Sequence, residues 1–167
     1  ELRGALRVLI FALVVRVAGA WVLGEGAPFG PDGTGAEASF HLGGHPYPLH
    51  IAMLHLTGGS ARALSMASGA LTAALLWSWG RRVGLGGIGG WLAATAPLTV
   101  LPGVLAAGDA PALLLVVLGA WLSTVGGVWL LIGGAIAAAS VAVKPIALPA
   151  LVLLLARPRA LASASSS

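Results

Sequence analysis

Two aspartates stand where a carboxylate could act on a substrate. Asp32 lies in the tight turn Phe29-Gly30-Pro31-Asp32-Gly33, and Asp109 directly precedes an apolar run. A carboxylate that is partly desolvated beside a membrane holds its proton more tightly and becomes a usable general base. Asp109 is equally suited to capping the helix that follows it. Asp32 and Asp109 are therefore the candidate catalytic residues, with capping as the alternative for Asp109.

Three cations stand beside or inside apolar runs. Arg62 begins one run, Lys144 ends another and Arg16 interrupts the first. A phosphate headgroup is the partner that such cations would meet, so Arg16, Arg62 and Lys144 are candidate lipid-phosphate ligands. The alternative for Arg62 and Lys144 is snorkelling to ordinary lipid phosphates. Arg16 is costly in hydrocarbon and should face a polar cavity or an acid such as Asp109 or Asp32.

The elements that must position these residues are apolar helices. Of the 167 residues, 58% are hydrophobic and 8% charged, which excludes a water-soluble domain. A helix needs about 20 apolar residues to cross a bilayer. The sequence predicts an all-α membrane protein, a polytopic bundle of about six transmembrane helices, followed by a disordered tail over 160–167. The expected helices are about 5–23, 61–79, 88–107, 110–125, 128–143 and 146–156. Because Lys144-Pro145 separates the last two, one long kinked helix is the alternative there.

The charges predict one orientation for this bundle. Placing the N-terminus inside puts six arginines on the cytoplasmic side and most of the acids outside, as the positive-inside rule favours. Both termini are then cytoplasmic. A cleaved signal peptide is the alternative for the first helix, because Ala18-Gly19-Ala20 mimics a cleavage site, but Arg16 argues against it. The arginines in question are Arg3, Arg7, Arg81, Arg82, Arg157 and Arg159.

The polar connection after the first helix is the longest in the chain. Residues 24–48 are rich in Gly and Pro and are expected to form an outer-face loop, and 47–56 a short interfacial helix. No cofactor is expected, although a divalent metal stays an alternative because four histidines lie nearby. Scattered basic residues argue against nucleic acid, so membrane lipids are the expected partner. The histidines are His41, His45, His50 and His55.

Two glycine-containing patterns have structural explanations. Residues 84–89 match G-x-G-x-x-G, but no strand precedes them, so we expect a cytoplasmic turn. Ala61, Ser65, Gly69 and Ala73 form a stripe of small residues, which predicts close packing of the second helix against another.

In the order of its features, the chain resembles the membrane module of the GT-C superfamily, the glycosyltransferases that use polyprenyl-phosphate sugars, including protein O-mannosyltransferases and the aminoarabinose transferases of lipid A. The resemblance covers about residues 3–157. It rests on a first helix with Arg16, then Gly30-Pro31-Asp32, Tyr47-Pro48-Leu49-His50, Arg62-Ala63-Leu64-Ser65, Arg81-Arg82, Ala96-Pro97, Gly108-Asp109-Ala110 and Val143-Lys144-Pro145.

The resemblance implies an inverting sugar transfer on the outer face of a membrane, in bacteria the inner (cytoplasmic) membrane. Asp32 would be the general base, Asp109 the second acid, and Arg62 and Lys144 would stabilise the leaving phosphate. The chain departs from the family pattern, because Gly33 rather than another acid follows Asp32 and because family enzymes have further helices. Whether it is an enzyme therefore stays open. The alternative is a truncated, non-catalytic accessory subunit of a larger membrane complex. A third hypothesis, suggested by Arg16 within an apolar helix, is a small transporter or channel piece.

Overall fold

A computed structural model describes residues 2–23, 41–42, 45–46, 49, 52–53, 55, 60–104 and 108–143. Within these residues the protein is helical apart from one pair of two-residue strands. The strands are β1 (His41–Leu42) and β2 (His45–Pro46), paired antiparallel. The helices are α1 (Leu2–Leu23), α4 (Ala61–Arg82), α5 (Ile88–Thr95), α6 (Pro97–Val104), α7 (Asp109–Ser123) and α8 (Val128–Val143).

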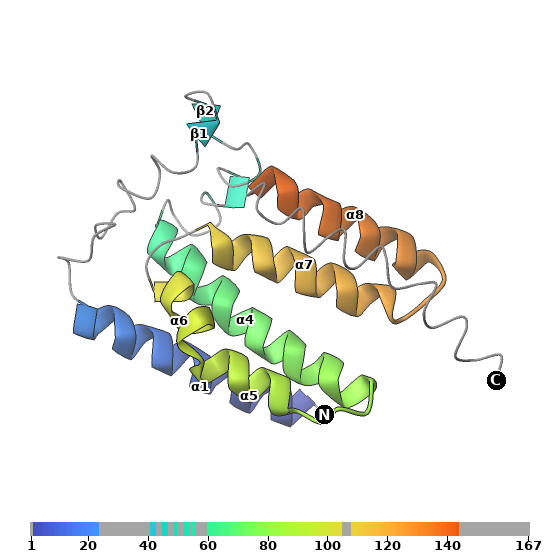
Figure 1. The fold of residues 1–167 in the computed structure, drawn as a ribbon, viewed down its shortest axis with the longest axis horizontal. Helices are drawn as coiled ribbons and strands as arrows, with labels where there is room; N and C mark the ends of the chain where they lie inside the picture. Colours follow the sequence, from blue (N-terminus) through green and yellow to red (C-terminus); the bar gives the residue numbers. More distant parts are fainter. Residues whose placement is uncertain are drawn as a thin grey trace.

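The helices lie alongside one another in a bundle with two distinct ends (Figure 1). Helix α4 is central, because it packs against α1, α5, α6 and α7, whereas α8 packs mainly on α7. One end, which we name the Asp109 end, holds Leu23, Ser60, Asp109 and Val143. The opposite end, the Arg81 end, holds the start of α1, the end of α4 and the α7–α8 turn.

The third expected helix, 88–107, is not continuous. It is divided at Ala96, which has an extended backbone (φ −65°, ψ 131°) between α5 and α6. Pro97 explains the division, because a proline ring disfavours the helical conformation at the residue before it and proline has no N–H to donate. The prediction of a single helix here was wrong. Residues 105–107, the end of that range, lie outside the described residues.

Helix α4 begins at Ala61 because Ser60 caps it. The Ser60 Oγ accepts a hydrogen bond of 3.2 Å from the Ala63 N–H. After Arg82, the turn at 83–87 holds Gly84 and Gly86 with φ of 78° and 68°, which favours glycine. The expected turn at the G-x-G-x-x-G segment is therefore confirmed. The stripe of small residues, Ala61, Ser65, Gly69 and Ala73, is buried, as predicted.

Helices α7 and α8 approach each other through glycine. A Cβ built on Gly119 would lie 2.5 Å from the Gly133 carbonyl oxygen, and one built on Gly133 would meet the Gly119 carbonyl oxygen. Neither position has room for a side chain. Glycine at both positions therefore sets the distance between these helices.

Part of the connection between α1 and α4 covers this pair of helices. Leu49 and Met53, four residues apart, pack against a buried cluster of Ala112, Val116 and Val143. The rest of the expected interfacial helix at 47–56 is largely outside the described residues, as are the sixth helix at 146–156 and the tail.

Among the described helices, α1 alone is both long and apolar enough to cross a membrane. Helices α7 and α8 are apolar but have only 15 and 16 residues. Helix α4 has 22 residues, but Ser65, Ser68 and Thr72 make it more polar. A six-span bundle therefore stays a prediction.

Candidate functional site

Arg16 is the largest fully buried side chain of the described residues. It lies on α1 in line with Val8 and Ala12, on the face buried in the bundle, and only 1% of its surface is exposed. Nη1 donates to the Ala12 carbonyl (3.0 Å), and Nη2 donates to the carbonyls of Ala93 (3.2 Å) and Thr99 (3.1 Å). All three acceptors are neutral backbone carbonyls, whereas a polar cavity or an acid was expected around Arg16.

Two of these bonds lie at the break between α5 and α6. In a continuous helix the N–H of residue 97 would donate to the Ala93 carbonyl, but proline has none. Arg16 Nη2 and the Thr99 hydroxyl (2.8 Å) donate to that carbonyl instead. The carbonyl freed by Pro97 thus has two donors, and α1 is tied to both halves of the broken helix.

Two glycines make room for the Arg16 side chain. A Cβ on Gly69 of α4 would lie 2.5 Å from Arg16 Nε, and one on Gly103 of α6 would lie 2.7 Å from it. Nε itself has no hydrogen-bond acceptor. The guanidinium therefore donates through its two terminal nitrogens to backbone carbonyls and has one unused donor, Nε.

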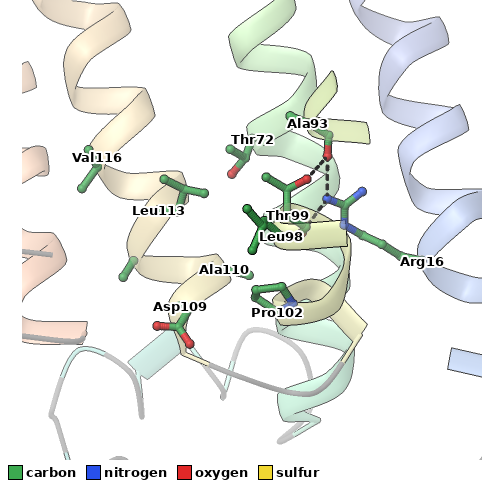
Figure 2. Close-up of a pocket in the computed structure, with 12 residues that line it drawn as sticks. Arg16, Thr72, Ala93, Leu98, Thr99, Pro102, Asp109, Ala110, Leu113 and Val116 are labelled. Atoms are coloured by element: carbon green, nitrogen blue, oxygen red, sulfur yellow. Dashed lines mark hydrogen bonds between the residues drawn. The ribbon is translucent and has the colours of Figure 1, made fainter. Parts of the chain in front are cut away.

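The Arg16 side chain lines a cavity of about 250 Å³ between α1, α4, α6 and α7. Figure 2 shows its walls: Arg16 reaches it from α1 and Asp109 from the start of α7. Thr72 and Thr99 add hydroxyl groups, and the remaining lining is apolar, including Leu98, Leu113 and Val116. The cavity thus combines a guanidinium, a carboxylate and a hydrophobic wall, a composition typical of sites for small amphiphilic molecules.

Asp109 is the first residue of α7, in a position that favours an acid electrostatically. It does not cap the helix in the expected way, because Gly108 is the N-cap residue and no side chain provides a capping hydrogen bond. A carboxylate in this first turn is stabilised by the helix dipole, and Asp109 is also part of the cavity wall.

The structure brings together two of the five predicted site residues, Arg16 and Asp109, at one cavity. Arg62 is half-buried in the first turn of α4, also at the Asp109 end, but it is not part of the cavity wall. Asp32 and Lys144 lie outside the described residues.

Several residues around Arg16 were not named as site residues from the sequence. Arg16 is surrounded by Thr72, Thr99, Gly69 and Gly103. Of these, Gly69 carried a signal through its place in the stripe of small residues, and nearby Pro97 carried one as a proline inside an apolar run. As for a metal, no group of three His, Cys, Asp or Glu side chains gathers within the described part of the chain.

The contact between Gly69 and Arg16 makes a prediction about stability. Gly69→Ala should lower the free energy of unfolding by about 2 kcal/mol, because its Cβ overlaps Arg16 Nε. With Arg16→Ala the overlap disappears, and the cost of Gly69→Ala should fall below about 0.5 kcal/mol. Denaturant unfolding in detergent micelles measures both, with Gly89→Ala as control, since its Cβ would approach nothing closer than 3.8 Å. If Gly69→Ala lowered the free energy of unfolding equally in the wild-type and Arg16→Ala proteins, the Arg16 side chain would not contact Gly69.

Against this geometry, known proteins offer no parallel: no protein-family model, curated protein sequence or solved structure matches the chain.

Proposed function

We propose that the chain is a GT-C-like membrane module that transfers a sugar from a polyprenyl phosphate to an acceptor hydroxyl on the outer face of a membrane. The cavity that contains Arg16 carries this proposal. A buried guanidinium that donates to neutral carbonyls favours an anion, and the apolar wall favours a ligand with a hydrocarbon part. A lipid phosphate satisfies both requirements.

The size of the cavity suits part of such a donor. Its volume of about 250 Å³ is somewhat below the roughly 300–1,000 Å³ of ordinary small-molecule sites. A sugar phosphate would occupy the cavity, and the polyprenyl chain would lie along the exposed apolar helix faces. Leu98 is both part of the cavity wall and 88% exposed, so it connects the cavity to the exposed apolar helix faces.

Chain connectivity supports a role for the two site residues that are not described. The connection that contains Asp32 leaves α1 at Leu23 and enters α4 at Ser60, both at the Asp109 end. Lys144 is bonded to Val143, the last residue of α8 at the same end. Together with Arg62 and Asp109, these residues are polar groups that could serve a reaction at the Asp109 end.

In the proposed reaction Asp32 accepts the proton of the acceptor hydroxyl while its oxygen attacks the anomeric carbon. The bond from that carbon to the phosphate oxygen breaks, and polyprenyl phosphate leaves with the electron pair. Arg16, Arg62 and Lys144 stabilise the negative charge that gathers on the phosphate. Asp109 is the second acid of the site and orients the sugar.

This mechanism predicts distinct effects for the acids. In nanodiscs, the chain should consume undecaprenyl phosphate carrying radiolabelled mannose or aminoarabinose and release undecaprenyl phosphate. Asp32→Asn should lower the rate by about 100-fold or more and Asp109→Asn by about 10-fold, since a general base contributes about 10²–10⁴-fold. Glu25→Gln, which removes an acid from the same connection, should stay within about twofold. Absence of turnover, or full activity of Asp32→Asn, would refute the catalytic proposal.

A second candidate is a non-catalytic subunit of a larger membrane complex. Helix α8 favours it, because this helix packs mainly on α7 and exposes Val128, Trp129, Leu130 and Leu131. Such a face can meet lipid or another protein. Stable co-purification with other chains in mild detergent, together with no turnover, would establish this role, and a monodisperse active monomer would exclude it.

A further inference from the structure

The Arg81 end of the bundle is strongly positive. Four of the six described arginines lie there, namely Arg3, Arg7, Arg81 and Arg82, and all four are exposed. The single acid of the described residues, Asp109, lies at the opposite end. Because no described carboxylate at the Arg81 end balances these charges, this surface favours an anionic partner.

Two of these arginines are held on indole rings. The guanidinium carbon of Arg82 lies 4.6 Å from the centre of the Trp121 ring, and that of Arg81 lies 5.8 Å from the centre of the Trp77 ring. Both distances are within the range of cation–π attraction. Arg3 and Arg7 have no such partner among the aromatic contacts of the described residues.

The Trp77 ring is fixed by close packing. A Cβ built on Gly4 of α1, or on Gly87 just before α5, would overlap the ring, and one built on Gly90 of α5 would meet the Cβ of Trp77. Two segments of the chain, α1 and the start of α5, thus pack closely against Trp77. Arg81 is therefore positioned on a rigid support, and little side-chain freedom is lost when it binds an anion.

Unused donors lie next to Arg82. The indole nitrogens of Trp79 and Trp121 are buried without a hydrogen-bond partner. Trp79 is three residues before Arg82 on α4, so the two side chains share a face, and Trp121 lies under Arg82. The Arg82 guanidinium and the two indole N–H groups are all hydrogen-bond donors. A ligand rich in oxygen would meet the exposed guanidinium groups first, and the indole N–H groups lie behind them.

We propose that Arg81, Arg82 and their tryptophans bind the phosphate headgroup of an anionic phospholipid. Charge complementarity identifies the phosphate, and the surroundings identify the lipid: Val83, Leu85 and Ile88, which follow directly, are 49%, 74% and 65% exposed. A headgroup phosphate can meet the arginines while its acyl chains cover these side chains. The site lies at the end opposite the cavity and does not depend on sugar transfer.

The test uses the full chain in nanodiscs of neutral phosphatidylcholine, with or without one quarter phosphatidylglycerol. Phosphatidylglycerol should raise the melting temperature Tm by about 4 °C, as a ligand that binds only the folded state does. Arg81→Gln/Arg82→Gln should remove most of this rise. The matched control, Arg3→Gln/Arg7→Gln, takes the same charge from the same end and should keep it.

Each alternative result refutes the proposal. Equal losses in the two double variants would show that any positive charge at this end suffices, without a built site. A rise in Tm with inorganic phosphate in neutral nanodiscs, equal to that with phosphatidylglycerol, would assign the site to a free anion. No rise with phosphatidylglycerol would leave the arginines as simple surface charges.

Discussion

Arg16→Met is expected to lower the proposed sugar transfer by about 100-fold, the effect of removing one group that stabilises transition-state charge. The same variant should change the free energy of unfolding by less than about 1 kcal/mol. The carbonyls that Arg16 contacts keep other donors: Ala93 keeps the Thr99 hydroxyl (2.8 Å), and Ala12 and Thr99 lie inside helices. Methionine fills much of the same space without the cost of burying a charge. Turnover and denaturant unfolding of the same preparation measure both effects.

The control for this variant is Arg7→Met on the same helix, where Arg7 is exposed at the opposite end. It should keep full turnover. Arg16→Lys should recover part of the activity, because it restores the charge but not the planar group that reaches two carbonyls at once. If Arg16→Met instead unfolds the protein while Arg7→Met does not, Arg16 is a structural tie between α1 and the broken helix. In that case the anion site needs another cation.

Gly133→Ala is expected to lower the free energy of unfolding by about 3 kcal/mol, at the upper end of ordinary overpacking. The added Cβ would meet the Gly119 carbonyl oxygen and would lie 2.6 Å from the Ser123 Oγ. The clash involves backbone, so rotating a side chain cannot relieve it. The helices α7 and α8 would have to separate along their main contact. Unfolding in detergent micelles measures the loss.

Gly134→Ala is the matched control, because it is the next residue on α8 and its Cβ would have nothing within 4 Å. Replacing an exposed helical glycine by alanine should stabilise the protein by up to about 1 kcal/mol. The two substitutions are chemically identical and differ only in the face of α8. Similar effects of both would mean that α7 and α8 do not pack through Gly119 and Gly133.

The first residue of α4 and the existence of helices α7 and α8 could be predicted from the sequence, because local signals determine them. Ala61 follows a serine that caps the helix, and 128–143 is an uninterrupted apolar run after two glycines. The division at Ala96 was missed although Pro97 is visible in the sequence. Prolines are tolerated in membrane helices when other groups satisfy the freed carbonyl, and here those groups come from Arg16 and Thr99.

The candidate site was predictable only in part. A buried position for Arg16 followed from its place in an apolar run, and so did a polar environment. The identity of its partners did not. A polar cavity or an acid was expected, whereas the acceptors are backbone carbonyls, one of which, that of Ala93, is released by a proline 81 residues later in the chain than Arg16. Gly69 was predicted only to belong to a closely packed stripe, and Gly103 was not singled out. The space that both leave for Arg16 exists only after α1, α4 and α6 have packed.

The break between α5 and α6 has a consequence for how this protein could move. In transporters with broken helices, dissolved ions bind at the unwound point and are exchanged with the solution. Here the cation at the break belongs to α1, because it is the guanidinium of Arg16. Unlike a dissolved ion, this side-chain charge cannot be diluted, displaced by a competing ion or driven by an ion gradient. The charge can leave the break only if α1 shifts or Arg16 changes rotamer, so occupancy of this position is coupled to the position of a helix.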